Sequence, residues 1–205
     1  PSGEINNVPY LKKISQYARK VILSSGMSTL DEVKFAKSFF EKNGIISENI
    51  FILQCTSDYP CSFKDAHLNV IKTFAEEFGE NIGFSDHTLG IEAPIAAVAL
   101  GAKVIEKHFT LDRTMPGPDH KASLEPSELK SMITSVRNIE LALGSREKNP
   151  RECELETKLL ARKSIVASKN IQKGEQFTVE NITTKRPGTG LSPTNWEKTL
   201  GEKAQ

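Results

Sequence analysis

The sequence predicts an α/β fold: the C-terminal half of a (β/α)8 TIM barrel followed by a small β-rich domain. Through the first 144 residues, short β-branched apolar runs alternate with segments of helical spacing. Strands separated by single helices pair in parallel with right-handed crossovers. Polar residues follow each run, and no GxGxxG turn follows the first. Chemistry at the C-terminal ends of several strands is typical of a barrel rather than a doubly wound sheet.

Each apolar run is too short for a buried helix and is expected as a strand. The runs are residues 21–23, 50–53, 82–84 and 104–105. Helices are predicted between them: one opened by a Thr29/Glu32 capping box, one over about 68–78 and one over 91–100. A fourth helix should begin at Pro126 and end before Gly144. Four such units are half a barrel, so we expect the other half to precede Pro1.

The composition changes after residue 144. Residues 145–158 are rich in charge and contain Asn149-Pro150, which predicts a linker between the half-barrel of residues 1–144 and a second domain of residues 159–205. Short strands are expected there at 164–167 and 177–179, with tight turns at 173–175 and 185–190. Because the chain ends soon after Gly201, this domain is expected to be incomplete at its C-terminus.

Charge and cysteine content exclude several classes of protein. The 27 basic and 26 acidic residues leave a formal charge of +1, which provides no field for nonspecific binding of nucleic acid or an anionic membrane. The three cysteines include no CxxC pair, as expected for free thiols in the cytoplasm. No apolar stretch of membrane-spanning length and no secretory signal are present.

Two histidines are candidate metal ligands. His87 and His108 follow successive predicted strands, 21 residues apart, so their rings can converge above a barrel and bind a divalent ion through imidazole nitrogens. With only two ligands, an open catalytic site is favoured over a closed structural zinc site. The alternative is that each imidazole is hydrogen-bonded to a neighbouring carboxylate such as Asp86.

Further polar candidates lie at strand ends and in loops. Ser24, Ser57 and Ser85 can bind a phosphate, although for any single one of them the residues alone favour capping of the following helix. Asp119, in the loop 115–120, can accept hydrogen bonds from substrate hydroxyls or belong to a plain surface turn. Glu106 and Lys107 should face opposite sides of their strand, without an assigned role. His67 is expected in a first helical turn, Cys55 and Cys61 as structural residues, and Arg186 as a solvated basic turn.

Several motifs, in order along the whole chain, resemble the N-acetylneuraminate (sialic acid) synthase family, in its sialic and legionaminic acid branch. The resemblance identifies the second domain as an antifreeze-like SAF domain. The motifs are Pro1-Ser2-Gly3-Glu4, Ser24-Ser25-Gly26-Met27, Cys55-Thr56-Ser57-Asp58-Tyr59-Pro60, Phe84-Ser85-Asp86-His87-Thr88, Ile105-Glu106-Lys107-His108-Phe109-Thr110, Gly117-Pro118-Asp119-His120 and Lys185-Arg186-Pro187-Gly188.

The resemblance implies a metal-assisted condensation of phosphoenolpyruvate with an N-acylated hexosamine, giving a nine-carbon 2-keto acid and phosphate. The implied metal is Mn2+, with Mg2+ or Co2+ as alternatives, held by His87 and His108. The positions that match phosphoenolpyruvate contacts are Ser2, Ser24, Ser57 and Ser85, although relatives carry Asn at the position of Ser57. The positions around the sugar are Glu4, Tyr59, Asp119 and Arg186, with Glu4 and Asp119 as catalytic candidates.

The resemblance also implies a domain-swapped homodimer, in which Arg186 of one subunit reaches the N-acyl group bound by the other. Residues 1–205 alone are expected to be inactive, because the early barrel strands are missing from them. One alternative is another phosphoenolpyruvate-condensing barrel that takes a phosphorylated sugar, with Arg113 as the candidate for the second phosphate. Another alternative is a noncatalytic carbohydrate-binding protein.

Overall fold

Four parallel strands form the centre of residues 1–145 in the computed structural model, which describes all residues 1–205. The strands are hydrogen-bonded in chain order, which confirms a half-barrel sheet, because a doubly wound sheet reverses its order at a switch point. All four predicted runs are strands, each extended toward its polar end. They are β1 (Val21–Ser24), β2 (Ile50–Cys55), β3 (Ile82–Asp86) and β4 (Val104–Lys107).

Helices connect the strands as predicted. The Thr29/Glu32 capping box opens α2, and α5 begins at Pro126 and ends before Gly144, whose φ of 54° suits glycine. One expectation is wrong: His67 is not helical, because its φ is 47° and α3 begins three residues later. The helices of this unit are α1 (Val8–Ser15), α2 (Leu30–Lys42), α3 (Val70–Phe78), α4 (Glu92–Ala99) and α5 (Pro126–Leu143), with 3-10 turns η1 (Ser2–Glu4), η2 (Ser47–Asn49), η3 (Phe63–Asp65) and η4 (His120–Ala122).

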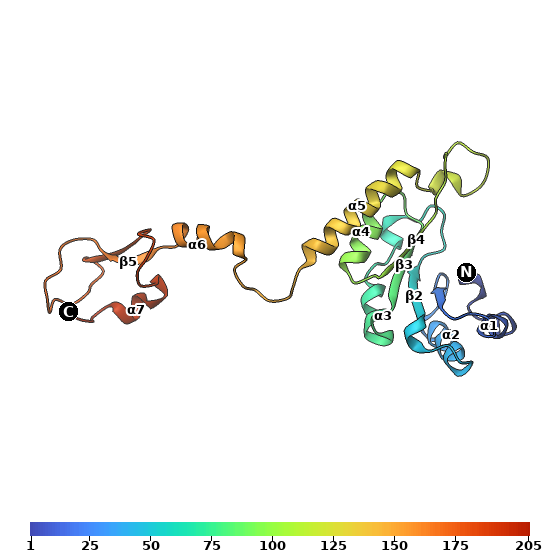
Figure 1. Ribbon diagram of the computed structural model, residues 1–205, viewed down its shortest axis with the longest axis horizontal. Helices are drawn as coiled ribbons and strands as arrows, with labels where there is room; N and C mark the ends of the chain where they lie inside the picture. Colours follow the sequence, from blue (N-terminus) through green and yellow to red (C-terminus); the bar gives the residue numbers. More distant parts are fainter. The chain divides into compact units, whose positions relative to one another are not determined.

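The two faces of the sheet differ in character. Successive side chains of a strand point to opposite faces, and the parallel register keeps partners on the same face. One face is the buried core, with α3 packed on β2 and β3 and α4 on β3, as Figure 1 shows. The opposite face is polar near its C-terminal edge. The core residues include Leu23, Ile52, Ile82, Phe84, Val33, Ile71 and Phe74, and the polar face carries Ser24, Cys55, Ser85 and Glu106.

A buried ion pair joins β3 to β4 on the helix-facing side. Lys107 Nζ lies 2.5 Å from Asp86 Oδ2, and their side chains are 3% and 0% exposed. Lys107 also donates to the Thr88 carbonyl at 2.6 Å, and Asp86 Oδ1 accepts from the Thr88 N–H at 2.8 Å. The pair lies at directly opposed register positions. It therefore ties together the two strand ends that the histidines follow, and Glu106 and Lys107 face opposite sides as predicted.

Residues 146–205 form the second unit, built on an antiparallel pair. Helix α6 begins inside the predicted linker 145–158, where Leu155 and Leu159 have helical spacing. None of the chain's helices meets the length and hydropathy needed to cross a membrane. The elements are η5 (Glu152–Glu154), α6 (Leu155–Ala161), β5 (Ser164–Ala167), β6 (Ile182–Lys185), η6 (Pro193–Asn195) and α7 (Trp196–Thr199).

The strand predicted at 177–179 is wrong. Asn181 is 2% exposed, and its side chain takes up the backbone groups that a strand ladder would use. Its Oδ1 accepts from the Thr178 N–H at 2.7 Å, and its Nδ2 donates to the Gln176 carbonyl at 2.9 Å. Asparagine competes with regular structure in this way. Residues 178–181 therefore form a turn. Phe177 extends the isolated bridge from Gln176 to Lys203, because its N–H donates to the Glu202 carbonyl and its carbonyl accepts from the Gly201 N–H, both at 2.9 Å.

We predict that Lys107→Met destabilises the fold strongly, because it leaves the Asp86 carboxylate buried without its partner. The free energy of unfolding, measured in urea on the whole protein, should fall by about 3–5 kcal/mol. Lys103→Met is the matched control, since its pair with Glu80 is exposed and screened by water. Equal losses in the two variants would show that the buried pair has no special weight.

Candidate functional site

The rings of His87 and His108 meet edge to face at the C-terminal edge of the sheet. Their centroids are 5.3 Å apart and their planes are inclined by 77°. A loop N–H holds each backbone carbonyl: the Cys61 N–H, in the loop after β2, donates to the His87 carbonyl at 2.8 Å, and the Leu124 N–H, just before α5, donates to the His108 carbonyl at 2.9 Å. The predicted convergence of the two imidazoles is therefore present.

Hydrogen bonding sets the tautomer of His87. Its Nδ1 lies 2.7 Å from the Thr56 carbonyl, which can only accept, so Nδ1 carries the proton and Nε2 keeps its lone pair for a ligand. The alternative that Asp86 satisfies this ring is wrong, because Asp86 is occupied by Lys107 and Thr88. No third His, Cys, Asp or Glu completes a metal-binding group. The two imidazoles fit an open divalent-ion site and not a closed structural one.

Cys55 contacts His87 and has more than a packing role. Its Sγ lies 3.8 Å from His87 Nδ1. Burial raises the pKa of the Cys55 thiol, but hydrogen bonds with His87, Ser24 and Ser85 outweigh burial and bring that pKa below its ordinary value. Burial lowers the pKa of His87, but its hydrogen bonds with Cys55 and the Thr56 carbonyl outweigh burial and raise that pKa.

The predicted phosphate-binding serines lie at the same edge of the sheet. Ser2 Oγ and Ser57 Oγ are 3.2 Å apart, although the two residues come from opposite ends of the β1–β2 unit. Gly26 allows this approach, because a Cβ there would lie 2.1 Å from Ser57 Oγ. None of Ser24, Ser57 and Ser85 caps a helix: the N-caps of α2, α3 and α4 are Thr29, Asn69 and Ile91. The capping alternative is therefore wrong.

Ser85 shows a partner that the sequence analysis missed. Its hydroxyl donates to Glu106 Oε1 at 2.7 Å, and the two residues lie at opposed positions on the polar face. Glu106 therefore places a carboxylate against Ser85, two residues before His108 in the chain. The sequence indicates only that Glu106 and Lys107 point to opposite faces of β4. That Ser85 lies opposite Glu106 follows from the pairing of β4 with β3.

Tyr59 and Asp119 also meet the histidines. The Tyr59 ring centroid is 4.1 Å from that of His87 and 5.5 Å from that of His108. Burial raises the pKa of the Tyr59 phenol, so its hydroxyl remains a hydrogen-bond donor. Asp119 Oδ2 lies 3.8 Å from His108 Nδ1, and the side chain is 53% exposed. Both side chains are thus available to a ligand bound beside the rings.

Two predicted residues are not joined to this group by any contact. The Glu4 carboxylate accepts a hydrogen bond from Asn7 Nδ2 at 2.6 Å and touches none of the other candidates. Arg186 is exposed and belongs to the second unit, directly after β6. The first unit alone therefore brings together Ser2, Ser24, Ser57, Tyr59, Ser85, His87, His108 and Asp119.

We predict that Cys55→Ala lowers the pKa of His87 in the metal-free protein, because the variant loses a hydrogen bond that favours the imidazolium. Since the folded-state pKa is raised, the protonated ring stabilises the fold below about pH 6.5, and this contribution is lost as the pH rises through the folded-state pKa. An NMR titration of the ring measures the change. Cys153→Ala, which removes an exposed thiol, is the control; an unchanged titration in both variants would contradict the prediction.

Comparisons with known proteins agree with this arrangement. The model of the NeuB family matches residues 1–148, and that of the SAF domain matches residues 162–205. The N,N'-diacetyllegionaminic acid synthase of Campylobacter jejuni is 50% identical over 202 residues, covering 98% of this chain and 60% of that protein. The synthase of the same name from Legionella pneumophila is 44% identical over 207 residues, covering 99% of this chain and 58% of that protein.

A solved structure shares the fold. The N-acetylneuraminic acid (sialic acid) synthetase from Leptospira borgpetersenii, in complex with citrate, aligns with a TM-score of 0.70 and 38% identity. The alignment covers 76% of this chain and 54% of that one. The chain spans about 60% of the length of the two N,N'-diacetyllegionaminic acid synthases.

Proposed function

We propose, because this chain belongs to the NeuB family, that the whole protein condenses phosphoenolpyruvate with an N-acylated hexosamine to give a nine-carbon 2-keto acid and phosphate. One observation carries the proposal: the ring centroids of His87 and His108 lie 5.3 Å apart, at the edge of the sheet where the serines of its polar face also lie. The acceptor is N-acetylmannosamine or its 2,4-diacetamido-6-deoxy analogue. The identity to two relatives named for diacetyllegionaminic acid favours the second.

His87 and His108 would hold the divalent ion of the reaction. A bound Mn2+, or Mg2+ or Co2+ in its place, supplies Lewis-acid polarisation of an acceptor carbonyl. The Thr56 carbonyl fixes the His87 ring with Nε2 available. The interacting Cys55 and Tyr59 limit the rotation of that ring. The chain's contribution is thus an oriented and partly dehydrated pair of ligands.

The serine hydroxyls would bind phosphoenolpyruvate. Ser2 and Ser57 are already within hydrogen-bond distance of each other, so together they can offer two hydroxyls to one phosphate or carboxylate oxygen. Ser24, the last residue of β1, and Ser85, the last but one of β3, lie on the same face of the sheet. The Ser85 hydroxyl donates to Glu106 in this structure, so it must turn away from that carboxylate to donate its single proton to phosphoenolpyruvate.

The acceptor sugar would lie over the histidines. Tyr59 can donate to a sugar oxygen and Asp119 can accept from sugar hydroxyls, since both are half exposed beside the rings. Glu4 is proposed to move a proton during the reaction. Arg186 is proposed to reach the N-acyl group from the SAF domain of a second subunit in a domain-swapped homodimer. We also propose a complete (β/α)8 barrel and a cytoplasmic location for the whole protein.

An acceptor carrying its own phosphate is disfavoured. Arg113 was the candidate for a second phosphate, but its guanidinium is paired with Glu128 and donates from Nε to the Ser123 carbonyl at 2.9 Å. A phosphate would have to displace both partners. A noncatalytic carbohydrate-binding protein remains the alternative from another class, and it requires neither the histidines nor the oriented serines.

Phosphate release from phosphoenolpyruvate by the whole protein tests the proposal. Release should depend on one of the two acceptors, stop when EDTA removes the metal and return with Mn2+. Omitting the acceptor is the control. Binding of either sugar without any phosphate release would favour the carbohydrate-binding alternative.

We predict that His87→Ala and His108→Ala each abolish the metal-dependent condensation, because each removes one of only two imidazole ligands. Mn2+ affinity, measured by calorimetry, should fall in parallel. His67→Ala is the matched control, since His67 lies outside the group. Undiminished rates in the first two variants would contradict the metal assignment.

A further inference from the structure

We propose that Arg113 is a positioning residue for the acceptor sugar: it clamps the loop of residues 114–122, which carries Asp119, to the start of α5. The inference rests on the proposed function, because it concerns how Asp119 is presented to that sugar. Arg113 itself lies in the loop after β4, and its hydrogen bonds go to Ser123, Glu125 and Glu128 rather than to the histidines or to the serines proposed to bind phosphoenolpyruvate.

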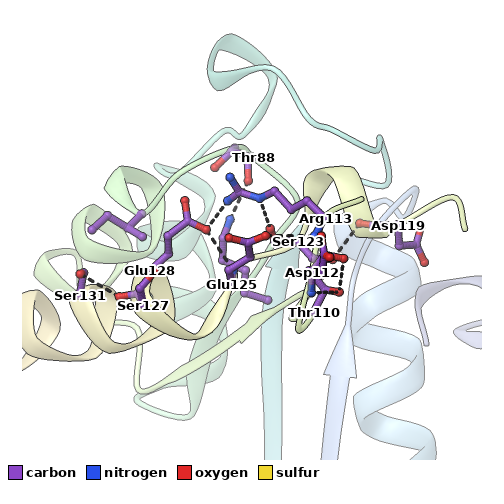
Figure 2. Close-up of polar contacts among 12 residues, drawn as sticks. Thr88, Thr110, Asp112, Arg113, Asp119, Ser123, Glu125, Ser127, Glu128 and Ser131 are labelled. Carbon is purple, nitrogen blue, oxygen red and sulfur yellow. Dashed lines mark hydrogen bonds and ion pairs between the residues drawn. The ribbon is translucent and has the colours of Figure 1, made fainter. Parts of the chain in front are cut away.

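Three contacts tie Arg113 to the far end of this loop, as Figure 2 shows. The Arg113 backbone N–H donates to Glu125 Oε1 at 3.0 Å. Its Nε donates to the Ser123 carbonyl at 2.9 Å. Its Nη2 forms an ion pair with Glu128 Oε2. Residue 113 is thereby fixed to residues 123–128, and the nine residues between them become a closed loop.

The receiving groups are themselves rigid. Glu125 is the N-cap of α5, and Glu125 and Glu128 form its capping box, with the Glu125 N–H donating to Glu128 Oε2 at 3.0 Å. The Arg113 guanidinium holds the pKa of the Glu128 carboxyl below its ordinary value, which keeps the partner ionised. Arg113 therefore anchors the loop to the N-terminal end of α5.

The clamp matters because the Asp119 side chain has no hydrogen bond of its own within the chain. Its Oδ2 lies 3.8 Å from His108 Nδ1, beyond hydrogen-bond distance. Only backbone contacts place it: the Asp119 carbonyl accepts from Ser123 Oγ at 2.8 Å and from the Ala122 N–H at 3.1 Å. Ser123 is the residue whose carbonyl receives Arg113 Nε. The position of Asp119 thus depends on the contact that Arg113 makes.

A second anchor exists nearer the tip, but it does not replace the first. Thr110 Oγ1 lies 2.8 Å from His120 Nδ1, which holds the later part of the loop. Residues 114–118 have no comparable side-chain tie to the helices. Lysine cannot substitute for Arg113, because a single ammonium does not reproduce two directed N–H donors in a planar fork.

The test uses the whole protein with Arg113→Met, which keeps the aliphatic stem, and Arg113→Lys, which keeps the charge. Both should raise KM for the acceptor roughly 10- to 100-fold, since small misplacement of a binding group has effects of this size. KM for phosphoenolpyruvate should remain unchanged. Arg137→Met is the matched control, because Arg137 forms an exposed ion pair with Glu140, and both residues lie in α5.

Hydrogen exchange of the amides of residues 114–122 provides a readout that does not need catalysis. Faster exchange confined to this loop in the Arg113 variants, with the kinetic split above, would support the proposal. Unchanged loop exchange would overturn it. Equal increases in both KM values with a lowered melting temperature would also overturn it, by showing a merely structural role. A wild-type protein that consumes no acceptor would instead overturn the proposed function, and the exchange data would still decide whether Arg113 holds the loop.

Discussion

The buried ion pair between Asp86 and Lys107 is the interaction on which the site depends. Each partner immediately precedes one of the histidines in sequence, and the two lie at opposed register positions. Two charges hidden from water are tolerated only when they satisfy each other and their remaining hydrogen bonds. Slippage of β4 against β3 would separate them, so the pair opposes it. The pair thereby holds the strand ends from which His87 and His108 converge.

The alternation of side chains then separates stability from chemistry. Asp86 and Lys107 face the helices, whereas Ser85 and Glu106, one residue earlier on each strand, face the opposite side. Polar groups can therefore gather on one face without weakening the apolar core on the other. In the absence of substrate these polar groups must form hydrogen bonds with one another. The Ser85 hydroxyl accordingly donates to the Glu106 carboxylate, and the Cys55 thiol is hydrogen-bonded with Ser85.

The loops beyond the strands are held by hydrogen bonds to backbone groups more than by apolar packing. The carbonyls of His87 and His108 each accept from a loop N–H. Gly26 makes room for Ser57, and Arg113 closes the loop of Asp119. Such contacts are directional, so they restrict orientation where burial alone would not. Half-exposed side chains such as Tyr59 and Asp119 can in this way be well placed without being buried.

The sequence by itself determined the four strands, the capped helices α2 and α5, and the side chains that follow each strand, because apolar periodicity and capping are local properties. The family motifs pointed to the same residues. Only the tertiary structure decided that Asp86 pairs with Lys107 rather than with His87 and that Ser85 donates to Glu106. It also decided that Arg113 binds the start of α5 and that a turn around Asn181 replaces the strand predicted at 177–179. Each of these depends on which groups distant in sequence become neighbours, and the energy of a polar contact is set by that neighbour and by the exclusion of water.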